Sequence, residues 1–191
     1  MRPWSDRPIQ DCLESLEHLP PQLFRIEPHP YASIGAPYGP GRDPFRLRSG
    51  VVRRLLEAQD QLHNHAPELQ FAIFDAWRPI SVQAFMVNYT IDQLCQERGV
   101  ERHDPAQQAA LHQVEADVAR FWAAPSRNPE TPPPHSTGAA VDLTLATGTG
   151  ALLQMGGDID AIGAVSEPDY YASATTTAVS YTHLTLPTKD S

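Results

Sequence analysis

The chain has few cysteines, few basic residues and no long apolar run, and each shortage excludes a class of protein. Cys12 and Cys95 are its two cysteines, too few for a disulfide framework or a cysteine zinc site, and no Cys-x-x-Cys motif occurs. Lys and Arg number 14 against 23 Asp and Glu, a formal net charge of -9. This balance argues against nucleic acid and anionic membrane surfaces as partners and favours small polar or zwitterionic ligands.

The lack of apolar segments also bears on the expected location of the protein. Residues 1–20 carry charged side chains throughout and no apolar run, so they do not resemble a secretory signal. No stretch is long and apolar enough to span a bilayer. We therefore expect a cytoplasmic protein. Its 191 residues fit one domain with a substantial core.

Hydrophobic periodicity predicts helices and short strands in turn. The helices are expected over about residues 50–64, 80–98 and 104–122. The strands are expected over residues 70–74 and from Ala139 onward. Because these elements show no regular βαβ alternation, they favour an α+β fold.

Residues 1–48 are rich in proline, carry little periodicity and predict a wrapping arm or a set of loops. Within this arm His29, Tyr31 and Tyr38 either line a pocket or anchor the packing of the chain. Packing is the commoner role of an aromatic side chain between prolines, so we leave these residues outside the candidate site.

A histidine and an aspartate seven residues apart form the first candidate site. His135 and Asp142 lie on either side of Gly138, after three prolines at 132–134. Imidazole nitrogen and carboxylate oxygen are both good zinc ligands, and a catalytic zinc takes three protein ligands and keeps a fourth position for water. The spacing alone also fits a loop histidine followed by a turn aspartate.

The second candidate site follows the strand predicted at 70–74. The sequence Asp75-Ala76-Trp77-Arg78-Pro79 places an arginine directly before a proline, which biases Arg78 towards extended backbone. A planar, permanently charged guanidinium suits the oxyanion that forms when water adds to an amide carbonyl. The alternative is that Arg78 only pairs with Asp75.

Both segments resemble motifs of the zinc D-alanyl-D-alanine dipeptidases, the vancomycin-resistance type and its relatives. Four residues fall in register with the Ser-x-His-x-x-Gly-x-Ala-x-Asp signature of that family: His135, Gly138, Ala140 and Asp142. Pro133 stands where the signature has serine. The second segment is similar to Asp-Gly-Tyr-Arg-Pro, with Ala76 and Trp77 as departures, and the resemblance covers about residues 45–172.

The resemblance implies an α+β fold in which helices pack on a small antiparallel sheet that carries one zinc ion per chain. It implies hydrolysis of the dipeptide D-alanyl-D-alanine in cell-wall metabolism, with His135 and Asp142 as zinc ligands and Arg78 stabilising the transition state. A D,D-carboxypeptidase or an L,D-endopeptidase acting on longer cell-wall peptides is the alternative within the superfamily. A non-catalytic zinc-binding module is the alternative from another class.

The family pattern also requires a downstream Glu-x-x-His segment that supplies the general base and the third zinc ligand. Only His183 follows Asp142, and Ser180 occupies the position three before it. Residues 179–184 closely resemble the translated end sequence of a transposon used in DNA sequencing libraries, with 185–191 as read-through. We therefore expect an incomplete zinc dipeptidase domain over 1–178, a non-native tail over 179–191 and an inactive fragment.

Overall fold

The computed structural model describes residues 8–159, 161, 165 and 170. The predicted non-native tail at 179–191 lies outside the described residues, as does the predicted domain boundary at 178, and both stay predictions.

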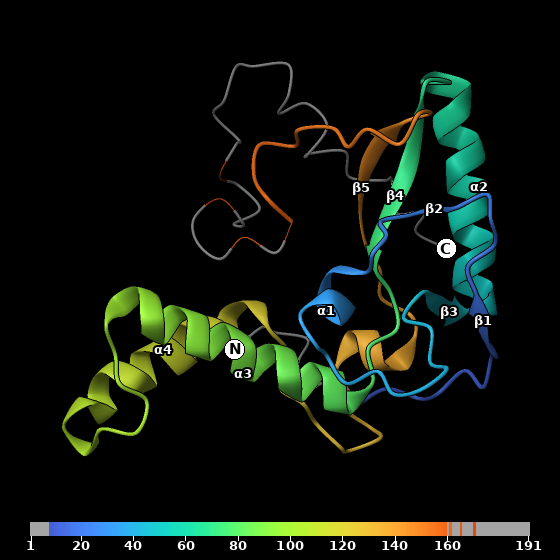
Figure 1. Cartoon of the computed structure of the whole chain (residues 1–191). Coiled ribbons are helices and arrows are strands. Elements are labelled where there is room, and N and C mark those ends of the chain that lie inside the picture. The colour runs from blue at the N-terminus through green and yellow to red at the C-terminus, as the bar shows by residue number, and fades with distance from the viewer. Residues whose placement is uncertain (1–7, 160, 162–164, 166–169, 171–191) are drawn as a thin grey trace.

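Helices and short strands alternate irregularly along the described chain (Figure 1). The strands are β1 (Leu16–His18), β2 (Phe24–Arg25), β3 (Arg46–Arg48), β4 (Leu69–Asp75) and β5 (Asp142–Thr147). The α-helices are α1 (Pro30–Ser33), α2 (Ser49–His65), α3 (Ile80–Arg98) and α4 (Gln108–Phe121). Two 3-10 turns complete the set, η1 (Pro105–Gln107) and η2 (Pro134–Thr137).

Two small sheets confirm the α+β class. One pairs β1 with β3 antiparallel, and the other has the order β2-β4-β5. Strand β4 pairs antiparallel with β5 over most of its length, as expected, but it pairs parallel with β2. The second sheet is therefore mixed, because the arm meets the free edge of β4 in the same direction and pairs with it over two residues.

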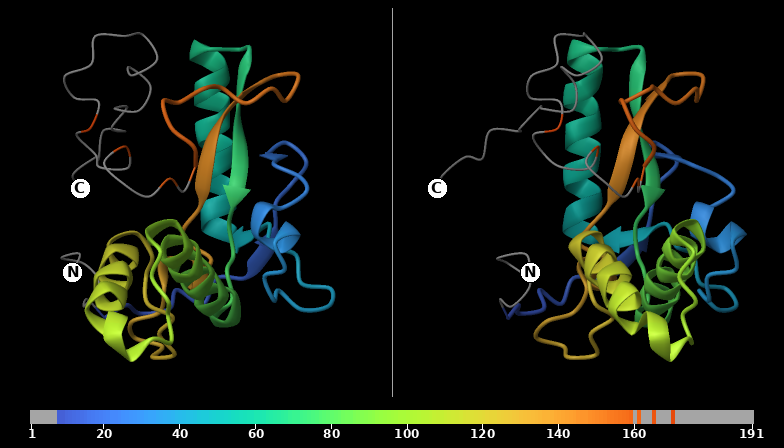
Figure 2. Two further views of the ribbon diagram at one scale, coloured as in Figure 1. Left: turned by 60° about the vertical axis from the view of Figure 1, so that its left-hand side comes forward. Right: turned by 90° about the vertical axis from the view of Figure 1, so that its left-hand side faces the viewer.

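Helix α2 runs beside β4 and β5, whereas α3 and α4 pack together near the end of the sheet where β4 stops (Figures 1 and 2). The main core lies between α2, the sheets and the arm, and its members include Leu47, Leu55 and Ile73. A separate cluster, which includes Ile91 and Val114, joins α3 to α4. Among the described residues no helix combines the length and the apolar composition that a membrane crossing needs.

The predicted helices are confirmed, with differences at their starts. Helix α2 begins at Ser49 itself, so Ser49 is not its cap; Glu14 of the arm accepts a hydrogen bond from Gly50 N at 2.6 Å instead. Asp104 caps the 3-10 turn η1, and α4 begins at Gln108, four residues later than expected. Helix α3 ends where expected, because Gly99 adopts the left-handed conformation, with φ 65°.

The arm is more ordered than a set of loops, since it contains β1, β2, α1 and β3. Leu16 of β1 packs against Gly138, where an added Cβ would lie 2.2 Å from the Leu16 side chain. Gly138 also has φ 73°, a conformation that glycine adopts without strain. The arm therefore holds the glycine of the His135 segment in place.

Gln59 links α2 to the backbone of β4. Its side chain is buried, and Oε1 accepts the Phe71 backbone N–H of β4 at 2.7 Å. We expect Gln59→Leu to lower the free energy of unfolding by about 1–3 kcal/mol, because the partly buried N–H of Phe71 then loses this acceptor. Urea denaturation measures this loss, and Gln61→Leu on the exposed side of α2 is the matched control. Equal losses in both variants would contradict this role.

Candidate metal centre and its buried arginine

The two candidate segments, far apart in sequence, are joined by three hydrogen bonds. His135 Nδ1 lies 2.8 Å from the Ala76 carbonyl oxygen. Arg78 N donates to the His135 carbonyl at 3.2 Å, and Ser136 Oγ donates to the Arg78 carbonyl at 2.7 Å. The turn η2 is thereby fixed against the chain that leaves β4, and His135 and Arg78 cannot shift independently.

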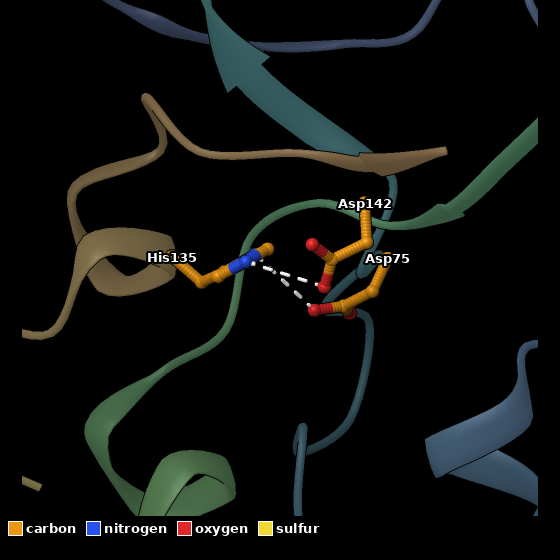
Figure 3. A group of neighbouring side chains, drawn as sticks. All are labelled: Asp75, His135 and Asp142. Atoms are coloured by element: carbon orange, nitrogen blue, oxygen red, sulfur yellow. Dashed lines mark ion pairs between the residues drawn. The ribbon is translucent and has the colours of Figure 1, made fainter. Parts of the chain in front are cut away.

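The pairing of β4 with β5 brings the aspartates to the same place. Asp75 and Asp142 are partners in the antiparallel register, next to a shift in that register after Ile73. Figure 3 shows both carboxylates directed towards the imidazole of His135. The sequence prediction placed His135 and Asp142 in one site, and the structure brings them together.

His135 and Asp142 face each other through atoms that can bind a metal. Asp142 Oδ2 lies 3.3 Å from His135 Nε2. A carbonyl oxygen only accepts, so the contact with Ala76 places a proton on Nδ1 and directs the Nε2 lone pair towards Asp142. Metal-binding histidines are commonly oriented by this kind of bond to a carbonyl oxygen.

Burial lowers the pKa of His135, but the protonated imidazole can also donate from Nε2 to Asp142, and this hydrogen bond and the charge of Asp142 outweigh burial and raise the pKa above its ordinary value. The side chain of Asp142 is 35% exposed, whereas that of His135 is 13% exposed. A position that favours positive charge and opens on the Asp142 side suits a divalent cation.

Asp75 is the third residue of this cluster and its second carboxylate, with an oxygen within 4.8 Å of the donor atoms of the other two residues. Its Oδ1 accepts from His29 Nε2 at 3.1 Å and from Tyr38 OH at 3.2 Å. Its Oδ2 accepts two hydrogen bonds from Arg78, at 3.1 and 2.6 Å. Four donors occupy the acceptor sites of the carboxylate, so Asp75 fits the role of an anchor better than that of a metal ligand.

The Asp75 carboxylate is fully buried and ionised. Burial raises its pKa, but the hydrogen bond from His29 and the charge of Arg78 outweigh burial and lower the pKa below its usual value. His29 is fixed in turn, because its Nδ1 accepts the Ala32 N–H at 3.3 Å and so leaves Nε2 as the donor. The buried charge is thus compensated by residues from the arm as well as by Arg78.

Arg78 is buried beside the candidate metal-binding atoms. Its Nη2 lies 3.6 Å from Asp142 Oδ2, and its Cζ lies 5.1 and 4.8 Å from the ring centroids of Tyr31 and Trp122. Burial lowers the pKa of Arg78, but the charge of Asp75 outweighs it and raises the pKa, so the guanidinium stays charged. Arg78 therefore pairs with Asp75 and also faces the candidate metal centre. Pairing with Asp75 does not prevent the guanidinium from facing a substrate there.

Several residues of this site escaped the sequence analysis. His29, Tyr31 and Tyr38 were left outside it, and the structure places them as packing groups that contact Asp75 or Arg78. Asp75 stood in the quoted motif, but only as a possible partner of Arg78. Trp122 had no signal in sequence beyond its place on an apolar helix face.

Comparison with known proteins identifies the family. The sequence profile of the D-ala-D-ala dipeptidase family matches residues 25–181. A D-alanyl-D-alanine dipeptidase of Synechocystis sp. (strain ATCC 27184 / PCC 6803 / Kazusa) is 42% identical over 174 residues, which are 90% of this chain and 69% of that protein.

A zinc-bound crystal structure of a mutant vancomycin-resistance D,D-pentapeptidase, VanY, also matches, with 16% identity and a TM-score of 0.45. The match covers 75% of this chain but only 59% of VanY, and at this level of similarity it carries no argument of its own. The matches in sequence are sufficient: the profile spans most of the chain, and the chain belongs to the D-alanyl-D-alanine dipeptidase family of peptidases.

Proposed function

We propose that this protein is a zinc dipeptidase that hydrolyses D-alanyl-D-alanine, with His135 Nε2 and the Asp142 carboxylate as zinc ligands. The observation that carries the proposal is the convergence of these two donors, 3.3 Å apart, beside the buried guanidinium of Arg78. Family membership supports the substrate, since the Synechocystis relative is a D-alanyl-D-alanine dipeptidase.

The donor set fits zinc. Imidazole nitrogen and carboxylate oxygen are its usual ligands besides thiolate, and the Ala76 carbonyl holds His135 in the tautomer that zinc binding requires. When bound, zinc would supply Lewis-acid polarisation of the scissile carbonyl. A structural ion in a non-catalytic module would not require a buried, charged arginine next to the ligands, and this favours the enzyme.

Arg78 supplies the fixed positive charge of the site. The scissile carbonyl oxygen gains negative charge as the tetrahedral intermediate forms, and a guanidinium held before the reaction stabilises that charge without reorganising. Asp75 keeps Arg78 ionised and limits its movement through the two bonds to Oδ2. Asp142 is the most exposed of the clustered side chains, so we infer that the dipeptide enters from its side.

The general base and the third zinc ligand are not assigned to described residues. Asp75, His135 and Asp142 are the described cluster that could hold an ion, and the sequence after Asp142 contains no Glu-x-x-His. We propose that such a segment is required and that residues 1–191 alone have little activity.

Hydrolysis of D-alanyl-D-alanine with added zinc, measured in parallel on residues 1–191 and on the chain extended by its genomic reading frame, tests the function. We expect release of D-alanine by the extended chain and little or none by residues 1–191. Equal activity would contradict the need for a further segment. Cleavage of longer cell-wall peptides in preference to the dipeptide would instead support a carboxypeptidase or endopeptidase.

We expect His135→Ala and Asp142→Ala in the extended chain each to weaken zinc binding by more than the roughly 10–100-fold that loss of a supporting partner costs. Competition with a chromophoric chelator measures the dissociation constant. His65→Ala, at the exposed end of α2, is the control and should bind zinc as the unmodified chain does. Stoichiometric zinc with unchanged affinity in both ligand variants would show that the assignment is wrong.

In the extended chain, Arg78→Ala should lower kcat by about 100-fold or more and leave KM nearly unchanged, because an oxyanion contact forms chiefly in the transition state. The substitution also leaves the buried Asp75 charge without its main partner, which is destabilising. Arg78→Lys keeps a positive charge near Asp75 and so separates the two effects. An effect confined to KM would make Arg78 a substrate-binding residue.

A further inference from the structure

Asp75 alone leaves the guanidinium of Arg78 incompletely fixed. Both hydrogen bonds between them, from Nε and from Nη2, end on the same oxygen, Oδ2. The other oxygen is occupied by His29 and Tyr38. An arginine that binds two carboxylate oxygens is held in a defined plane, whereas two bonds to one oxygen permit rotation about that point.

The aromatic neighbours do not remove this freedom. The ring centroids of Tyr31 and Trp122 lie 5.1 and 4.8 Å from Arg78 Cζ and 6.0 Å from each other. Rings on opposite faces of the guanidinium at these distances would lie much farther apart, so the two rings adjoin and cover one side. They add cation–π attraction without clamping both faces.

Gln83 provides a second fixed point. It lies in the first turn of α3 and is almost fully buried, and its Oε1 accepts from Arg78 Nη1 at 2.9 Å. Its Nε2 donates to the Ala123 carbonyl oxygen at 2.6 Å. Arginine only donates and a carbonyl only accepts, so the two contacts together allow one orientation of the amide.

The same amide fixes the aromatic side of the arginine, because Ala123 directly follows Trp122, whose ring lies against the guanidinium. A neutral amide also fixes Arg78 without adding charge. Asp75 and Asp142 already face the guanidinium, and a third carboxylate would reduce the positive potential available to a developing oxyanion.

We propose that Gln83 is a positioning residue that sets the orientation of the Arg78 guanidinium towards Asp142 and His135. The geometric part stands on the contacts of Gln83 alone, and its consequence for catalysis rests on the proposed function. Gln83 acts through Arg78 and is not expected to touch the substrate or the zinc ion.

Rotation of the Arg78 guanidinium, measured by NMR of residues 1–191 labelled in arginine, tests the geometry without any activity. The Arg78 signal is assigned from its loss in Arg78→Lys. We expect Gln83→Met to speed exchange of the Arg78 Nη groups by about 10-fold or more, as loss of a hydrogen bond to a charged group implies. Gln96→Met, on the exposed face of α3, is the matched control and should leave exchange unchanged. Unchanged exchange in folded Gln83→Met would overturn the proposal.

Gln83→Glu keeps an acceptor for Nη1 and should retain slow exchange. If Gln83→Met does not fold, Gln83→Glu alone tests the proposal, since fast exchange in Gln83→Glu would overturn it.

In the extended chain, Gln83→Met should lower kcat by about 10-fold or more with KM within about threefold, and should have no further effect in the Arg78→Ala background. Equal kcat losses in both backgrounds would show that Gln83 does not act through Arg78. Absence of hydrolysis by the unmodified extended chain would contradict the proposed function, and the NMR result would still decide the role of Gln83.

Discussion

The buried ion pair of Asp75 and Arg78 is the constraint on which the site depends. Two charges removed from water are tolerated only when further hydrogen bonds satisfy both groups, because desolvation otherwise exceeds their mutual attraction. Asp75 meets this condition through His29 and Tyr38, and Arg78 meets it through Gln83. The arm and α3 must therefore both pack against the end of β4 before the pair is stable there.

The same requirement explains why the candidate metal-binding segment, although far from β4 in sequence, packs against the chain that leaves β4. The carbonyl of Ala76 and both backbone groups of Arg78 are used by η2, through His135 and Ser136. Once the ion pair fixes Arg78, these bonds fix η2, and the register of β5 then places Asp142 opposite Asp75. The donor atoms converge because the backbone that carries them is already held, so a metal would meet preformed ligands.

Local signals in sequence predicted the parts of this structure that depend on neighbouring residues. Helix α3 could be predicted from the proline before it and from Gly99 after it, and β4 from its apolar run. The pairing of His135 with Asp142 came from a motif that records their spacing. The bonds from His29 and Tyr38 to Asp75 span 46 and 37 residues, and no local pattern encodes which distant donor reaches a buried carboxylate. The cap that Glu14 provides for α2, 36 residues away, was missed for the same reason.

Charge balance assigns different roles to the two aspartates. Asp75 is fully buried and its charge is matched by Arg78, so the inner pair is neutral as a unit. Asp142 is partly exposed, and Arg78 Nη2 lies 3.6 Å from it, beyond a good hydrogen bond. Its charge is therefore left for a cation shared with His135. If Asp75 bound the metal instead, Arg78 would lose its counter-ion in the interior. The difference in burial thus supports the proposal that Asp75 is an inner anchor and Asp142 an outer ligand.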